Sequence, residues 1–161
     1  MGYWLFKSEP DSYSFADLVR DGTTGWNGVR NFQARNFLRD AIRAGDGVLF
    51  YHSSTDPAAV VGIAEVVEAG HPDPSAFDPK SDYHDPKSKP DAPTWFQVTI
   101  KPVRAVDPPL TLARLREVPA LAGMELLRKG SRLSVQPVSE GEWKAIQELA
   151  GIKPAKKSRK G

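Results

Sequence analysis

The chain has 161 residues, of which 40% are hydrophobic and 26% charged, and its formal net charge is +2. This composition is typical of one soluble globular domain that can bury a core. The chain contains no cysteine, which excludes disulfides, a cysteine nucleophile, thiolate zinc sites and iron–sulfur clusters. No apolar run reaches the ~18 residues of a membrane span and the first ten residues lack a signal-peptide pattern, so we expect a cytoplasmic protein.

Positive charge is concentrated at the C-terminal end of the chain. Five of the 22 basic residues and no acidic residue lie in 153–161, so residues 1–152 carry 17 basic against 20 acidic side chains. We therefore predict a folded domain over 1–152 and a basic, disordered tail over 153–161. Such a tail either contacts phosphates, with strong salt dependence, or only keeps the chain soluble.

The first half of the chain alternates strand-like and helix-like patterns. Ser14 and Asn31 stand where helix N-caps are expected, and Gly22 and Gly45 supply the corresponding stops. The Gly- and Asn-containing segment 23–28 predicts a loop. The predicted elements are a strand over Tyr3–Phe6, a helix over Phe15–Val19, a helix with the apolar face Phe32, Phe37, Leu38, Ala41 and Ile42, and strands over Val48–His52 and Val60–Val67, the last with a bulge or close approach at Gly62.

The second half begins with an unusual segment, residues 70–93, which holds six prolines and repeats the sequence Asp-Pro-Lys-Ser. A long loop of this kind inside a domain is usually functional or disordered. The fold class we predict is one mixed α/β (α+β) domain with about five or six short strands. The elements predicted after the loop are a strand over Trp95–Val106, short helices over Leu110–Leu115 and Leu121–Leu127, a strand over Leu133–Val135 ended by Pro137, and a final helix capped by Ser139 and Glu142.

Three aromatic side chains lie in or beside loops, where the pattern gives them no obvious place in the core. Trp26 has glycines on both sides, Tyr83 lies within the proline-rich loop, and Trp95 directly follows it. Rings from separate segments can form a cage around a planar or cationic ligand such as a base. Alternatively, Trp26 folds back as a lid on the core, where we also place Trp4 and Trp143.

Polar residues follow the first two long strands and are candidates for reading the edge of a base. Lys7 and Glu9 flank a serine after the first strand, where their ammonium and carboxylate groups offer donors and acceptors. Alternatively, these residues bond their own backbone in a turn, and His52 is a structural histidine. The candidate polar pocket residues are Lys7, Ser8, Glu9, Asn27, Asn31, Tyr51, His52 and Ser53.

Basic residues at a spacing of four line one face of the second predicted helix. Arg35, Arg39 and Arg43 lie on this face, and Arg30 precedes the helix. If the face borders the Trp26 loop, Arg30, Arg35 and Arg39 are suited to contact phosphates; otherwise the stripe is a solvated surface.

Signatures of catalysis are weak. The sequence has no Gly-rich phosphate loop, no G-x-S-x-G and no H-E-x-x-H, and His71 and His84 match no metal-ligand spacing. We therefore expect no enzyme, no metal and no cofactor.

An ordered series of motifs between residue 2 and about residue 150 resembles the EVE domain family. The motifs are YWLFKSEP at 3–10, WNGVRNFQARN at 26–36, FYHS at 50–53, YHDPKS at 83–88 and RLSVQP at 132–137. One position departs from the family pattern, because Asn27 stands where we expect Asp in much of the family, and a charge beside the cage is thereby lost.

The resemblance implies a PUA-like fold, a small bent β-barrel surrounded by helices, with kinship to YTH domains that hold a methylated base in an aromatic cage. It also implies a non-enzymatic protein that binds modified bases in DNA or RNA, with Trp26 as a cage ring. We expect a nucleic-acid partner, no membrane and a monomer. The alternatives are an ASCH-like hydrolase of modified nucleosides or RNA, with Lys7 and Glu9 as acid and base assisted by Tyr51 or His52, and a module that docks a protein partner.

Overall fold

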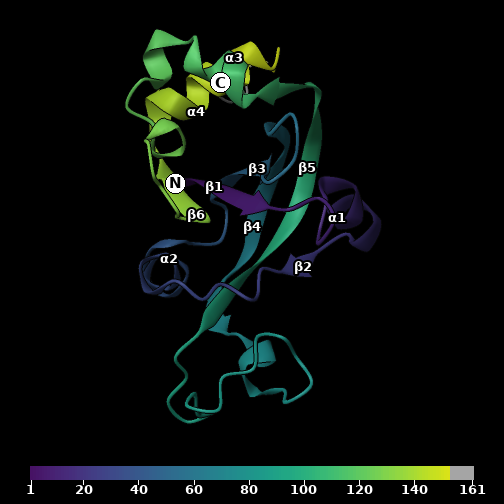
Figure 1. The fold of residues 1–161 in the computed structure, drawn as a ribbon, viewed down its shortest axis with the longest axis vertical. Helices are drawn as coiled ribbons and strands as arrows, with labels where there is room; N and C mark the ends of the chain where they lie inside the picture. Colours follow the sequence, from purple (N-terminus) through teal and green to yellow (C-terminus); the bar gives the residue numbers. More distant parts are fainter. Residues whose placement is uncertain (153–161) are drawn as a thin grey trace, which may run out of the picture.

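A computed structural model describes residues 1–152, which form a six-stranded mixed sheet with four α-helices (Figure 1). The strand order is β2-β5-β4-β3-β1-β6, with β1 and β3 parallel and all other neighbours antiparallel. The strands are β1 (Tyr3–Ser8), β2 (Thr24–Gly25), β3 (Gly47–His52), β4 (Ala59–Pro72), β5 (Phe96–Thr111) and β6 (Val135–Val138). The predicted α+β class and strand number are confirmed.

The helices are short and lie on both sides of the sheet. They are α1 (Phe15–Asp21), α2 (Phe32–Asn36), α3 (Leu112–Arg116) and α4 (Glu140–Leu149), with a π-helical turn η1 (Phe37–Ala41) and 3-10 turns η2 (Pro74–Phe77), η3 (Pro119–Leu121) and η4 (Glu125–Leu127). No helix within residues 1–152 has the length and hydropathy needed to cross a membrane. The tail predicted over 153–161 lies outside the described residues.

Two helix starts follow directly from local side-chain chemistry. Ser14 and Asp17 form a reciprocal capping box at α1, and Ser139 and Glu142 form the same arrangement at α4. Gly22 ends α1 at φ 80°, a conformation that glycine adopts without steric cost. These predictions needed only residues three or four positions apart, and they are confirmed.

The second helix ends differently from the prediction. It starts at the predicted Asn31 cap, but after Asn36 it widens into η1, where the Ile42 N–H donates to the Phe37 carbonyl at 2.9 Å. Ile42 is already extended, so Gly45 belongs to the following turn and is not the helix stop. The wider turn buries Leu38 and Ile42, while Phe32 at the helix start is 59% exposed.

The sheet carries an apolar cluster on each face. Phe6 and Phe50 belong to one cluster, together with Trp26, whereas Leu5 and Leu49 belong to the other. Because successive side chains of a strand point to opposite faces, the two clusters also show to which face each side chain at the end of β1 points. Ser8 shares the face of Phe6 and Trp26, and Lys7 shares the face of Leu5.

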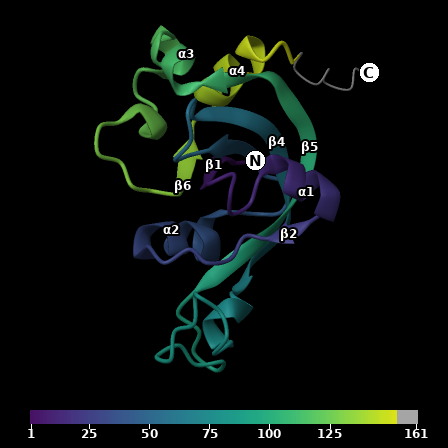
Figure 2. The ribbon, with the colours of Figure 1, turned by 45° about the vertical axis from the view of Figure 1, so that its right-hand side comes forward.

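The proline-rich segment lies at the tip of the long β4–β5 hairpin, below the body of the sheet in Figure 2. β4 runs on to Pro72 and β5 begins at Phe96, so Trp95 precedes its strand. β5 also extends to Thr111, beyond the predicted Val106, and α3 starts only after it. A short strand that the sequence analysis missed, β2, pairs with β5 and directs the chain from α1 towards this tip.

Two positions in the sheet depend on small or cyclic residues. The predicted close approach at Gly62 is confirmed, because a Cβ there would lie 2.4 Å from Cε1 of Phe15. Pro137 lies within β6 and does not end it, contrary to the prediction. Since the Lys7 N–H donates to the Ser134 carbonyl at 2.8 Å, the alternation of the ladder turns the backbone of Pro137 away from β1. The missing N–H therefore costs no hydrogen bond.

Candidate functional site

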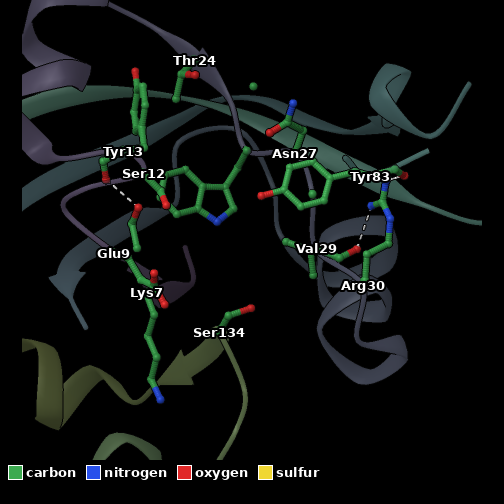
Figure 3. A pocket seen from close by; sticks show the side chains of 14 residues that line it. Lys7, Glu9, Ser12, Tyr13, Thr24, Asn27, Val29, Arg30, Tyr83 and Ser134 are labelled. Carbon is green, nitrogen blue, oxygen red and sulfur yellow. Dashed lines mark hydrogen bonds between the residues drawn. The ribbon is translucent and has the colours of Figure 1, made fainter. Parts of the chain in front are cut away.

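An open cavity of about 530 Å³ lies between the segment that follows β1, the loop that follows β2 and the tip of the β4–β5 hairpin (Figure 3). Its walls combine aromatic rings with hydroxyl, amide and carboxylate groups. The lining residues are Lys7, Ser8, Glu9, Ser12, Tyr13, Thr24, Gly25, Trp26, Asn27, Gly28, Val29, Arg30, Tyr83 and Ser134. The structure thus brings together six of the predicted site residues from the first 30 positions, and Tyr83.

Trp26 is at once a core residue and a wall of this cavity. Its side chain is only 8% exposed, and its ring centroid lies 5.2 Å from that of Phe6 and 5.4 Å from that of Phe50. Its backbone is held by a bond from the Trp26 N–H to the Val98 carbonyl at 2.7 Å. The indole therefore covers the core, as one prediction had it, and also borders an open void, which the cage prediction requires.

Tyr83 supplies a further ring of the cavity lining, besides those of Trp26 and Tyr13. It is 45% exposed and lies against the backbone of Gly28, where a Cβ would come within 2.6 Å of its ring. Gly28 has φ 78°, so both its backbone conformation and this contact call for glycine. In Figure 3 the Tyr83 ring lies between Asn27 and Arg30.

Trp95 does not reach the cavity, which corrects its assignment as a cage ring. It is 6% exposed, its Nε1–H donates to an Asp85 carboxylate oxygen at 2.7 Å, and its ring stacks on Phe32 at 4.9 Å. The Arg30 guanidinium carbon lies 5.0 Å from its ring centroid. Trp95 therefore stabilises the hairpin tip from outside the cavity.

The residues after β1 form a turn and also face the cavity. The Ser8 hydroxyl donates to the Tyr13 carbonyl at 2.5 Å, and the Glu9 carbonyl accepts from the Ser12 and Tyr13 N–H groups, each at 2.9 Å. The predicted local turn is thus present. The exposed Glu9 carboxylate lines the cavity and, among residues 1–152, takes part in no ion pair.

The Lys7 side chain points away from Tyr83. Its ammonium extends to the far side from Tyr83 in Figure 3, in keeping with its place on the face of Leu5. Burial lowers the pKa of Lys7, and the nearby Glu125 carboxylate opposes this shift. No ion pair joins Lys7 to Glu9 within the part of the chain that the structure describes, although both residues line the cavity.

Four predicted polar pocket residues lie outside the cavity lining. Asn31 caps α2 by accepting from the Ala34 N–H at 2.9 Å, and Ser53 donates through its backbone to Ser8 at 3.0 Å.

Tyr51 and His52 lie at the end of β3 and are buried or half-buried. Tyr51 is 3% exposed in the apolar cluster of Leu5, where burial raises its pKa. His52 Nε2 accepts from the Phe15 N–H at 3.1 Å, and burial lowers the pKa of this imidazole. Both residues pair with the end of β1, beside Lys7 and Ser8, but their side chains stabilise the fold and do not line the cavity.

The three arginines predicted to contact phosphates are engaged within the protein. Arg35 donates to the Thr94 carbonyl at 2.6 Å, and Arg39 forms two 2.7 Å bonds with the adjacent Asp40. Only Arg30 lines the cavity, and its guanidinium bonds Asp73 at 3.0 Å and the Tyr83 carbonyl at 2.6 Å. Each guanidinium thus uses only part of its five N–H groups within the protein, and the phosphate contacts stay a prediction.

The sequence analysis missed Asp73, which lies between the two loops of the cavity. Its side chain is wholly buried and accepts from the Gly28 N–H and from Arg30. Burial alone would raise its pKa, but hydrogen bonds from Ser75, Gly28 and Arg30 lower it below its ordinary value. The Asp-Pro sequence indicates a turn, but nothing near it in the sequence points to partners more than 40 positions away.

Within residues 1–152, no group of three acidic or histidine side chains could hold a metal ion.

Comparisons with known proteins show which family the chain is similar to. A family model described as EVE domain matches residues 2–149. Human thymocyte nuclear protein 1 is 34% identical over 172 residues, which cover 95% of this chain and 76% of that protein. The structure of human THYN1 protein in complex with 5-methylcytosine containing DNA superposes with a TM-score of 0.88 over 96% of this chain and 100% of that chain, at 34% identity.

Two further solved structures show how far the likeness extends. A crystal structure of a Pseudomonas syringae protein is 45% identical, with a TM-score of 0.88 over 92% of this chain and 99% of that chain. The ZmASCH protein of Zymomonas mobilis has a TM-score of 0.54 at 11% identity, over 92% and 99% of the two chains. At this identity the second likeness concerns the fold alone, and it gives the hydrolase alternative no support of its own.

Proposed function

This chain belongs to the EVE domain family, whose PUA-like fold it shares, and we propose that it binds modified bases in nucleic acid without acting as an enzyme. The observation that carries the proposal is the cavity between Trp26 and Tyr83. Each ring offers a surface on which a planar heterocycle stacks, a contact worth roughly 1–3 kcal/mol per base. A base in a strand would have to leave its stack to enter.

The groups at the rim of the cavity suit the polar edge of a base. The Glu9 carboxylate accepts hydrogen bonds, as an exocyclic amine of cytosine or adenine requires. The neighbouring Asn27 amide is exposed and offers both a donor and an acceptor. A methyl group on the base adds apolar contact area, and the Trp26 and Tyr83 rings provide apolar surface for it.

The human relative lends support, because its structure contains 5-methylcytosine DNA and its fold matches nearly the whole chain. The hydrolase alternative draws no comparable support, since the ZmASCH structure, at 11% identity, shares the fold alone. We therefore propose reading of a modified base and not turnover. The DNA-bound human structure makes DNA the first nucleic acid to test, with RNA of the same sequence as a comparison.

The proposal is tested by fluorescence anisotropy with matched oligonucleotides that carry cytosine, 5-methylcytosine or 5-hydroxymethylcytosine. Each is used as single- and double-stranded DNA and as RNA, at two salt concentrations. We expect at least one modified oligonucleotide to bind about fivefold or more tightly than its unmodified match, a difference of about 1 kcal/mol. This preference should persist at the higher salt, because phosphate contacts weaken with salt for all sequences alike.

Two results would contradict the proposal. Equal affinity for every modified and unmodified oligonucleotide would show binding to the backbone only. Absence of binding at low salt would instead favour a module that docks a protein partner.

A further inference from the structure

The two loops that face each other across the cavity are joined through one buried carboxylate. Asp73 follows β4 and has no exposed side-chain surface. Its oxygen Oδ2 accepts from the Gly28 N–H at 2.8 Å and from Arg30 Nη1 at 3.0 Å. Its oxygen Oδ1 accepts from the Ser75 N–H at 2.8 Å and from the Ser75 hydroxyl at 2.6 Å. We call these four residues, Gly28, Arg30, Asp73 and Ser75, the Asp73 clamp.

Two residues in contact with Tyr83, Gly28 and Arg30, are members of the clamp. A third contact is the bond from the Tyr83 N–H to the Ser81 hydroxyl at 3.0 Å. The Tyr83 ring lies on Gly28, closely enough that any side chain there would strike it. The Tyr83 carbonyl accepts from Arg30 Nη2 at 2.6 Å, and the Arg30 guanidinium carbon lies 5.5 Å from the Tyr83 ring centroid. Asp73 holds the partner on each side, so the position of the ring follows from the position of the carboxylate.

Apolar packing does not provide this support. Tyr83 is 45% exposed and belongs to neither of the two apolar clusters of residues 1–152. The loop around it holds almost no aliphatic residues. Its ring is therefore held by the clamp, and loss of the clamp leaves it free to move without opening the core.

We propose that Asp73 is a positioning residue that sets the distance between the Trp26 and Tyr83 rings of the base-binding cavity, acting through Tyr83. The proposal rests on the proposed function for its consequence in binding, but its structural part is independent of any ligand. Asn cannot replace Asp at this position. An amide offers one acceptor oxygen and an NH₂ donor, and the donor would face N–H groups of Gly28, Arg30 or Ser75. At least one buried donor would then lose its partner.

The structural part is tested by amide hydrogen exchange on unliganded protein. Asp73→Asn should increase exchange of the Gly28 amide and of the segment around Tyr83, while exchange in β3 and β4 stays unchanged. The matched control is Asp40→Asn, which removes another Asp–Arg pair, one that is exposed and outside the cavity lining. Unchanged exchange at Gly28 and Tyr83 in Asp73→Asn would overturn the proposal.

The binding part is tested by a double-mutant cycle with the 5-methylcytosine oligonucleotide. Asp73→Asn should weaken binding about tenfold in the wild-type background, within the range of directly coupled residues, and have little effect in a Tyr83→Ala background. A merely structural Asp73 would lower affinity equally in both backgrounds, and that result would overturn the proposal.

The experiments distinguish a variant that fails to fold from a clamp that does not exist, and failure of the proposed function from failure of the clamp. If Asp73→Asn does not fold, judged by circular dichroism, Arg30→Lys replaces it, because one ammonium cannot hold Asp73 and the Tyr83 carbonyl in the same fork. Increased exchange around Tyr83 in Arg30→Lys then supports the clamp, and unchanged exchange overturns it. If wild-type protein does not distinguish modified from unmodified oligonucleotides while Asp73→Asn still loosens Tyr83, the proposed function fails and the structural part of the clamp stands.

Discussion

Trp26 and Tyr83, two of the three aromatic residues that line the cavity, are held in place by different forces. Trp26 is packed into an apolar cluster with Phe6 and Phe50 and is 8% exposed, whereas Tyr83 is 45% exposed and depends on hydrogen bonds and an ion pair. Apolar packing fixes one wall as part of the core. The polar clamp fixes the other as part of a loop. Changes to the Trp26 wall should therefore affect the whole fold, and changes to the Tyr83 wall should affect the cavity alone.

The largest effect is expected for Trp26→Ala. Removal of this indole should lower the free energy of unfolding by about 3–5 kcal/mol, because it leaves a void beside Phe6 and Phe50. Urea denaturation followed by circular dichroism measures the change. Trp26→Phe serves as the control, since it keeps an aromatic surface and should retain more of both stability and binding. A fully stable Trp26→Ala protein would mean that the indole is not a core residue.

Tyr83→Ala should have a smaller and more selective effect. The melting temperature should stay close to that of the wild type, because the ring makes no core contact. Affinity for the modified oligonucleotide should fall by about 1–3 kcal/mol, the contribution of one base–aromatic stack. Anisotropy titration measures the affinity, and a thermal melt of the same preparation measures the stability. A large loss of stability would show that the two walls are supported alike.

The two walls should also differ in their response to pH. His52 supports the Trp26 side, because it accepts the Phe15 N–H and Phe15 packs on Phe50. Burial lowers the pKa of His52 below its ordinary value of 6.5, so the unfolded chain takes up this proton at a higher pH than the folded protein. The contribution of His52 to stability is therefore complete above pH 6.5 and is lost as the pH falls through the lower, folded-state pKa.

Unfolding in urea at pH 7.5 and at pH 5.5 measures this loss. His52→Gln keeps an acceptor without the titration, so its stability should change less between these two values. An equal change in both proteins would assign the pH effect to other groups. The Asp73 clamp should be unaffected in this range, because the pKa of Asp73 lies below its ordinary value of 3.8.

The smallest effect is expected for Arg39→Ala. Its guanidinium is paired with Asp40 and lies outside the cavity lining, so the affinity for each oligonucleotide should change less than about twofold. Its effect on the salt dependence of binding should be equally small. A uniform loss of affinity for all sequences, with a flatter salt dependence, would restore Arg39 as a phosphate contact.

Much of the fold was predictable because its signals are local. Ser14 and Ser139 cap their helices with partners three residues away, and Gly62 marks the close approach of another segment. The sequence pattern of β1 and β3 also indicated the buried strands. The limits of β4 and β5 were not predictable, because the two strands continue by pairing with each other far beyond their apolar stretches.

The candidate site was predictable where aromatic residues stand in loops and polar residues follow a strand. Trp26 and Tyr83 stand in segments without periodicity, and both reach the cavity. The role of Arg30 was not predictable. Its charge indicates that it binds an anion, but the sequence does not show that the anion is the buried Asp73 carboxylate of the same chain. Trp95 was misassigned for the same reason, since its partners Phe32 and Asp85 come together only in the fold.

Pro137 in β6 has a consequence for the outermost edge of the sheet. Its backbone nitrogen points outward at the end of the strand order, and the residue is exposed. A strand from another molecule that approached this edge would find no N–H to pair with at that position. The same residue that leaves the ladder with β1 intact therefore makes this edge a poorer template for an added strand.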